Sequence, residues 1–432
     1  MTYTPSPHHE HEERERIEES RREREERRER GGTTVEESLA CLKEWAVGTK
    51  EKAIMELLTH SRQDCFKSCP RRHWYTYERG LRPTSDAKAL RMGSAFHVGT
   101  EELGRGRGLE LACSAVRLHY DKAWRGFGPA DHDMLFEQET VLRLICAYQW
   151  RWEGQSLANL AVELPFQIPL KNPESGRSAS GWKLAGKIDG IVCLEDERMA
   201  VKETKLLGDD IGPDSDLWRR LRIDHQISLY LIAARRLGYH CETVLYDVCR
   251  KPTIKPGDVA ILDAAGGKIV LDRQGDRVRT ERGVYRQTGD KEKGYTLQTR
   301  PMTATEWGEK LSADIAERPD FYFVRREVPR LDQDLARYEV ELWDIYQALR
   351  DAKKHDRWWR TVNKHTCPYC PYFDLCSADV DISGAAPDGF EFVYDKHPEL
   401  SKGEPQNGNS PPETASACTA STSELAQGDG GW

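Results

Sequence analysis

The chain has 432 residues, enough for two or three domains or for one large domain with appendages. Hydrophobic residues make up 38% and charged residues 31%, a polar balance that long polar ends can produce. The formal net charge is −8, so no global basic field indicates binding to a polyanion. Any such contact has to come from a local basic patch or from bound metal ions.

The two ends differ in composition from the middle. Residues 8–30 contain ten Glu and eight Arg with one apolar residue, Ile17, which favours either a solvated helix or a disordered arm. Residues 383–432 are rich in Gly, Ser, Pro, Thr and Asn, which indicates a disordered tail. We therefore expect an arm at 1–58, a domain at 59–382 and a tail at 383–432. Without a signal segment or an apolar spanning run, we expect a cytoplasmic protein with no membrane partner.

The middle of the chain mixes helical and strand-like patterns. We expect helices at 61–80, from near Gly93 through His97, and at 216–237, 303–317 and 328–353. We expect strands at 159–169, 182–193, 198–206 and 241–250. No internal repeat is apparent. This mixed order predicts an α/β fold.

Two acidic residues and a lysine stand at the centre of these patterns. Asp189 ends the segment Gly-Lys-Ile-Asp, and Glu203 and Lys205 form an E-x-K triplet on the next expected strand. Residues i and i+2 of a strand face the same side, so Glu203 and Lys205 should point into one site. A hairpin can bring Asp189 beside Glu203, and two carboxylates make a hard oxygen site for Mg²⁺ or Mn²⁺. Alone, an E-x-K triplet is more often a surface ion pair.

Two further motifs flank this triplet. Gln226 and Tyr230 are four residues apart and share one face of an expected helix. By themselves they fit an ordinary amphipathic helix. His97 follows a small-residue segment at Gly93, and a lone histidine is more often structural than a ligand. Their order along the chain is the informative feature.

Taken in order, the motifs resemble the RecB-like branch of the PD-(D/E)XK nucleases. The matches to the four motifs of that branch are Gly93 with His97, Gly186 with Asp189, Glu203 with Lys205, and Gln226 with Tyr230. The resemblance covers roughly residues 60–380. It implies a restriction-endonuclease-like mixed sheet core with a helical lobe, and a metal-dependent DNA exonuclease.

The resemblance also implies roles for these residues. His97, Asp189 and Glu203 would bind Mg²⁺ or Mn²⁺, which activates water and polarises the phosphate. Lys205 would assist the attacking water. Gln226 and Tyr230 would position the phosphate or Lys205.

Three C-terminal cysteines suggest a second metal centre. Cys367, Cys370 and Cys376 have the spacing C-x2-C-x5-C, which leaves one ligand to come from elsewhere. The pattern resembles AddB-type helicase–nucleases and CRISPR-associated RecB-like exonucleases, which have one cysteine before the histidine motif. This resemblance implies a 4Fe-4S cluster that closes the helical lobe, with Cys69, followed by proline, favoured over Cys65. Zinc remains the alternative metal.

Basic and aromatic residues near Cys69 are candidates for DNA contact. Arg71, Arg72 and Tyr75 lie in a segment that mixes backbone-binding charge with stacking rings, which suits single strands. The alternative is that the aromatic residues belong to the core of the cysteine lobe.

We therefore expect cleavage of DNA, at single-stranded ends, in phage DNA processing, recombination and repair, or CRISPR adaptation. No P-loop motif is visible, so a helicase or recombination factor would be a separate partner. One alternative is a non-catalytic DNA-end-binding subunit of a helicase–nuclease complex. A zinc-stabilised adaptor is the other.

Overall fold

The computed structural model describes residues 55–123, 129–155, 157–397 and 400. The chain divides into a unit that ends at Glu56 and a second unit that begins at Leu57. All but the last four residues of the expected arm at 1–58 lie outside the described residues. The second unit contains every motif singled out in the sequence.

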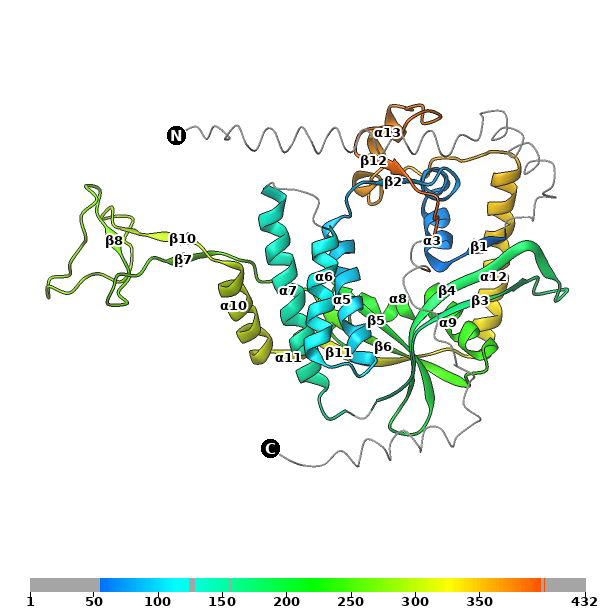
Figure 1. The fold of residues 1–432 in the computed structure, drawn as a ribbon, viewed down its shortest axis with the longest axis horizontal. Coiled ribbons are helices and arrows are strands. Elements are labelled where there is room, and N and C mark those ends of the chain that lie inside the picture. The colour runs from blue at the N-terminus through cyan, green and yellow to red at the C-terminus, as the bar shows by residue number, and fades with distance from the viewer. Residues whose placement is uncertain (1–54, 124–128, 156, 398–399, 401–432) are drawn as a thin grey trace, which may run out of the picture. The chain divides into compact units, whose positions relative to one another are not determined.

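A six-stranded sheet forms the centre of this unit (Figure 1). Its strands are β1 (Glu56–Leu58), β3 (Ala158–Lys171), β4 (Ser178–Cys193), β5 (Met199–Leu207), β6 (Cys241–Arg250) and β11 (Phe323–Pro329). The order is β1-β4-β5-β6-β11, with β3 paired to β4. β5 and β6 are parallel, while β3/β4, β4/β5 and β6/β11 are antiparallel. The expected α/β class with a mixed sheet is therefore confirmed.

Helices cover both faces of the sheet. One face packs against α5 (Lys88–Gly104), α6 (Leu109–Ala123), α7 (Pro129–Trp152), α10 (Ala304–Glu317) and α11 (Pro319–Tyr322). The other face packs against α3 (His60–Ser68), α8 (Asp216–Leu221), α9 (His225–Arg236) and α12 (Asp332–Lys354). Within β5, Leu206 packs on the face covered by α5, and Val201 packs on the face covered by α9. This double coverage explains why β5 is apolar at both ends, and it makes polar residues inside the strand unusual.

A small lobe, the cysteine lobe, joins the two ends of the described chain. α4 (Pro70–His73), a π-helical turn (Trp74–Glu78) and β2 (Leu81–Pro83) follow α3. A 3₁₀ turn (Cys367–Tyr369), α13 (Phe373–Ser377) and β12 (Phe390–Phe392) come from the C-terminal side. β12 pairs with β2, so ordered structure continues past residue 382, where we had placed the start of a tail. Residues 401–432 of that tail lie outside the described residues.

The helix expected at 61–80 is interrupted. Cys69 is extended, with φ −163°, and Pro70 starts a new helix. Proline disfavours helical backbone in the residue before it and has no N–H to donate, which explains the break.

The helix expected at 216–237 is also interrupted, between α8 and α9. The Asp224 carboxylate accepts the Ile227 N–H at 3.1 Å and starts α9 as its N-cap. α6 and α7 lie in a region for which we had expected no element.

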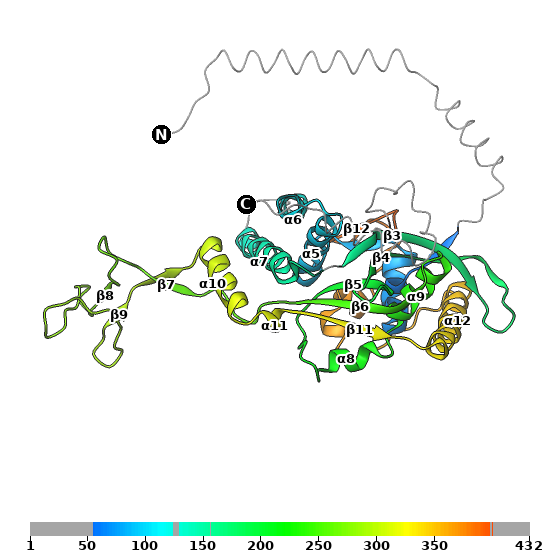
Figure 2. The same cartoon turned by 90° about the horizontal axis from the view of Figure 1, so that it is seen from below.

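An arm of short strand pairs, residues 258–301, separates β6 from α10. It contains β7 (Asp258–Ala260), β8 (Val270–Leu271), β9 (Thr296–Leu297) and β10 (Thr299–Pro301). Figures 1 and 2 show it extending away from the sheet beyond α10. Four tight turns follow one another here, each with a glycine of positive φ, at Gly266, Gly275, Gly283 and Gly294. The arm is a repeat of turns that no sequence pattern had indicated.

None of the helices in the described residues is both long and apolar enough to cross a bilayer.

Candidate active site

His97 lies in the middle of α5, which begins at Lys88 rather than near Gly93. A Cβ at Gly93 would meet open space, so packing does not explain the glycine of this motif. The His97 Nδ1 atom is 3.5 Å from an Asp189 carboxylate oxygen. Burial lowers the pKa of His97, which favours the neutral imidazole that can donate a lone pair to a metal.

Asp189 lies on β4, just before this strand pairs with β5. The pairing of β4 with β5 begins at Gly190 and Lys202 and continues to Cys193 and Met199. One Asp189 carboxylate oxygen accepts the Thr204 N–H at 2.8 Å. The carboxylate therefore accepts a β5 backbone hydrogen bond that a neighbouring strand would otherwise accept, and it also faces His97.

Glu163 is a site residue that the sequence motifs did not identify. It lies on β3, between Val162 and Leu164, which pair with β4 on either side of Asp189. Its φ is 53°, a left-handed conformation that is uncommon for a residue with a side chain. The available signal was that Glu163 is the one acidic residue of this mostly apolar strand.

His97, Glu163 and Asp189 together form a group that could hold a metal. One ligand atom from each lies within 4.8 Å of the other two. Glu163 also forms an ion pair with Lys187 of β4. Burial and then the Asp189 charge raise the pKa of Glu163, while Lys187 opposes the rise. Neutral imidazole and carboxylate oxygens suit a divalent cation, which would relieve this repulsion.

Glu203 and Lys205 face the same side of β5, as expected. The Lys205 ammonium is 2.5 Å from one carboxylate oxygen of Glu203, whose side chain is 2% exposed. The other carboxylate oxygen is buried and has no hydrogen-bond partner among the described residues. Burial and then the Asp189 charge raise the pKa of Glu203, so Asp189 acts on both Glu163 and Glu203. An unpaired buried carboxylate oxygen is what a bound cation would satisfy.

Gln226 and Tyr230 lie on α9 above the same face. The Gln226 amide donates to the Tyr230 hydroxyl at 3.1 Å, and burial raises the pKa of Tyr230. A Cβ at Gly186 would lie 2.6 Å from the Phe166 ring and 3.4 Å from Tyr230. The glycine of the G-x-x-D motif thus gives Phe166 and Tyr230 room to pack beside Asp189.

A buried polar network lies on the opposite face of β5. The Asp247 carboxylate accepts from Tyr148 at 2.5 Å and from Arg325 at 2.9 Å, and Lys202 is 3.4 Å away. Lys202 also donates to the Tyr148 hydroxyl at 3.0 Å and lines the hollow that contains His97, Glu163 and Asp189. The network anchors the strand from which Glu203 and Lys205 project.

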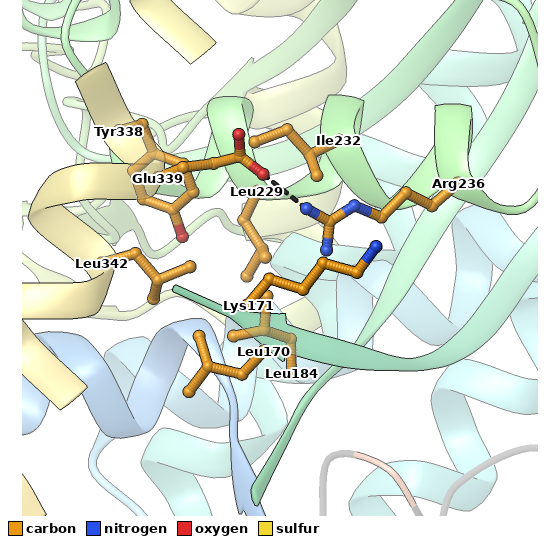
Figure 3. Close-up of a pocket in the computed structure, with 9 residues that line it drawn as sticks. All are labelled: Leu170, Lys171, Leu184, Leu229, Ile232, Arg236, Tyr338, Glu339 and Leu342. Atoms are coloured by element: carbon orange, nitrogen blue, oxygen red, sulfur yellow. Dashed lines mark hydrogen bonds and ion pairs between the residues drawn. The ribbon is translucent and has the colours of Figure 1, made fainter. Parts of the chain in front are cut away.

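A second hollow, between α9, α12 and the sheet, has a different character (Figure 3). Leucine and isoleucine side chains form most of its wall, and Arg236 and Glu339 pair across it. It offers a single carboxylate and no imidazole or thiol, so it does not resemble a metal site.

Comparison with known proteins identifies the family of the chain. A family model described as the PD-(D/E)XK nuclease superfamily matches residues 57–377. The chain belongs to this superfamily. Members of this superfamily are nucleases that use divalent metals. No curated protein matches the chain.

One solved structure, "Crystal structure of SSO0001", resembles this superfamily member in part. The two share 12% identity over 79% of this chain and 93% of that chain, with a TM-score of 0.28. A TM-score this low adds nothing to the assignment of fold or function.

The cysteine lobe brings together the thiols expected from the sequence. The Thr361 N–H donates to the Cys69 sulfur at 3.5 Å, and the Cys367 sulfur is 3.8 Å from the Thr361 carbonyl oxygen. Burial raises the pKa of Cys370, and the nearby Cys69 and Cys376 add to the rise. The Arg360 guanidinium donates to the Cys376 sulfur at 3.3 Å. The four positions therefore converge from opposite ends of the domain.

The residues expected to contact DNA differ in exposure. Tyr75 is 1% exposed and stacks on Tyr372 at 5.1 Å, so the prediction that it contacts DNA is corrected: it is a core residue of the lobe. Arg71 pairs with Asp379 at 3.0 Å and lies over the Trp74 ring, which also indicates a structural position. Arg72 is exposed and remains available.

Proposed function

We propose that this superfamily member is a metal-dependent DNA exonuclease that hydrolyses phosphodiester bonds at single-stranded ends. The observation that supports it most is the unpaired, buried carboxylate oxygen of Glu203 beside the group formed by His97, Glu163 and Asp189. These groups fit Mg²⁺ or Mn²⁺, which when bound supplies an activated water and neutralises charge on the phosphate.

Each residue has a role that follows from its position. His97, Glu163, Asp189 and Glu203 would hold the metal. The Lys205 ammonium, which lies beside Glu203, would orient the attacking water and stabilise the developing negative charge.

The α9 pair supports Lys205. Tyr230, held by the Gln226 amide, closes the apolar side of the site and excludes water other than the nucleophile. The charge of Lys205 lowers the pKa of Tyr230 in opposition to burial, which indicates that the two groups lie close together.

The cysteine lobe is proposed to hold a 4Fe-4S cluster bound by Cys69, Cys367, Cys370 and Cys376. The C-x2-C-x5-C spacing of the last three and the approach of Cys69 and Cys367 to Thr361 support this proposal. Zinc is the alternative metal for four thiolates. Iron and acid-labile sulfide in equal amounts, in brown protein purified without oxygen, would support the cluster; zinc in their place would contradict it.

The function is tested with anaerobically purified protein and DNA labelled at one end. Linear single strands, linear duplex and a closed single-stranded circle are incubated with Mn²⁺ or EDTA, beside the variant Glu203→Gln. We expect Mn²⁺-dependent loss of linear single strands, survival of the circle and no cleavage by the variant.

Other outcomes separate the alternatives. Cleavage of the circle would replace the exonuclease with an endonuclease. Binding of DNA ends without any cleavage would indicate the non-catalytic subunit instead.

A further inference from the structure

The distal part of the arm, residues 261–298 between β7 and β10, is basic in an acidic chain. It contains eight Lys and Arg against six Asp and Glu, a net charge of +2, whereas the whole chain has −8. Most of its side chains are exposed. A local patch of this kind is what the overall charge requires if the protein is to bind a polyanion away from its metal site.

Three of the six acidic residues in this segment accept backbone N–H groups in its turns. The Asp272 carboxylate accepts the N–H groups of Gln274 and Asp276, each at 2.9 Å. Asp290 accepts the Lys293 N–H at 3.2 Å and pairs with Arg286 at 3.5 Å. These carboxylates close tight turns, so their presence is explained by folding rather than by solubility.

Several basic residues of the arm have no acidic partner in the described part of the chain. Five of them have neither a carboxylate within ion-pair distance nor a side-chain hydrogen bond in the part of the chain that the structure describes: Lys268, Arg273, Arg282, Lys291 and Lys293. All five are exposed. An exposed cation without a partner is free to meet a phosphate.

Aromatic rings hold some guanidinium groups of the arm in place. Arg277 and Arg279 lie over the Tyr285 ring, at 3.9 Å and 4.3 Å from its centroid, and Arg286 lies 5.1 Å from that of Tyr295. Other contacts hold the same groups: Arg277 pairs with Asp263, Arg286 pairs with Asp290, and Arg279 donates to the Gly283 carbonyl and the Tyr285 hydroxyl. These three side chains therefore stiffen the arm, and the exposed cations without such partners are the ones left for an anion.

The chain leaves the sheet near the site on its way to the arm. Tyr246 of β6 pairs with Glu203, and β6 ends four residues later at Arg250. At about 3.3 Å per residue, this end of β6 lies roughly 13 Å from the level of Glu203. The arm begins shortly after it, at Asp258.

We propose that the distal arm binds the phosphate backbone of nucleic acid beyond the segment being cleaved. The proposal rests on the function proposed above, because a nuclease substrate is the polyanion that this surface would meet. A two-stranded ribbon with projecting cations can follow a single strand or enter a duplex groove. Such a contact holds the substrate between successive cuts.

The test measures DNA binding in EDTA, where cleavage does not intervene. The arm variant changes four exposed bases to Gln: Arg273, Arg282, Lys291 and Lys293. A matched control changes four exposed bases of α8 and α12 to Gln: Arg219, Arg337, Arg350 and Lys354. A third variant keeps the arm charge by exchanging Arg for Lys and Lys for Arg at the four arm positions. Affinity for a long labelled strand is measured across salt concentrations.

We expect the arm variant to bind roughly tenfold or more weakly, and its salt slope to fall by about 3, since each lost single-strand phosphate contact removes about 0.7. The charge-keeping variant and the matched control should bind like the unchanged protein. Equal affinity and slope for the arm variant, or an equal loss in the matched control, would overturn the proposal. Because no cleavage is measured, a failed nuclease assay and a failed arm assay remain distinguishable.

Discussion

The sheet site and the cysteine lobe gather their candidate ligands in opposite ways. At the sheet site, Asp189 and Glu203 come from strands that are neighbours both in the chain and in the sheet, and Glu203 is buried. In the lobe, Cys69 contacts Thr361 across 292 residues, and all four thiols are partly exposed. Removal of a ligand should therefore affect chemistry at the sheet site and folding in the lobe.

The largest effect is expected at Glu203. Glu203→Gln keeps the shape of the side chain but removes the charge that would bind a cation, so cleavage should fall by about a thousandfold or more. Rates on end-labelled DNA measure it, with Glu195→Gln, an exposed acid of the β4–β5 turn, as the control. A variant that retains a tenth of the rate would show that Glu203 is no ligand.

A loss of stability is expected in the lobe. Cys69→Ser should abolish iron incorporation and lower the free energy of unfolding by several kcal/mol, because cluster binding contributes directly to folding. Cys65→Ser is the matched control, since Cys65 lies one helical turn earlier. If Cys65→Ser loses iron and Cys69→Ser keeps it, the assignment of the fourth ligand is reversed.

A smaller effect is expected at Glu163. Glu163→Gln should weaken Mn²⁺ binding by at least roughly 10–100-fold, because it removes the negative charge of one proposed ligand. Calorimetric titration with Mn²⁺ measures it, and the exposed acid Glu174 of the β3–β4 turn provides the control as Glu174→Gln. Unchanged affinity would leave Glu163 as a partner of Lys187 alone.

The smallest effect concerns His73, which joins the lobe to the sheet. Arg62 donates to its Nε2 atom at 3.2 Å, and burial together with the Arg62 charge lowers the pKa of His73 to about 2. The unfolded chain binds a proton near pH 6.5, so this contribution is present above pH 6.5 and is lost as the pH falls below it. Between pH 6.5 and 4.5 the unchanged protein should lose about 2 kcal/mol more than His73→Gln. Parallel unfolding curves with equal pH dependence would contradict this.

The sequence predicted the sheet site better than its surroundings. Side chains alternate between the two faces of a strand, and this local property of the backbone correctly predicted Glu203 and Lys205 on one side. Glu163 was not predicted as a site residue, because its position depends on a left-handed backbone opposite Asp189 that no local sequence pattern reveals. Tyr75 was misassigned because a ring beside basic residues looks the same in sequence whether it faces solvent or Tyr372.

Prediction was weakest where tertiary structure overrides local preference. The break at Cys69 follows from Pro70 and was visible in the sequence, yet the expected helix ran through it. Helices α6 and α7 were not assigned, although they cover one face of the sheet. The arm was not predicted because its four turns vary in spacing. Only the positive φ of the four glycines makes the repeat evident.

A crystal grown with Mn²⁺ and measured near the manganese absorption edge would show directly whether the sheet site binds the metal. We expect an anomalous peak within bonding distance of His97, Glu163 and Asp189, with the free oxygen of Glu203 turned toward it, and loss of that peak in Glu203→Gln. An anomalous peak elsewhere, or none at a Mn²⁺ concentration that supports cleavage, would contradict the assignment of these residues as metal ligands.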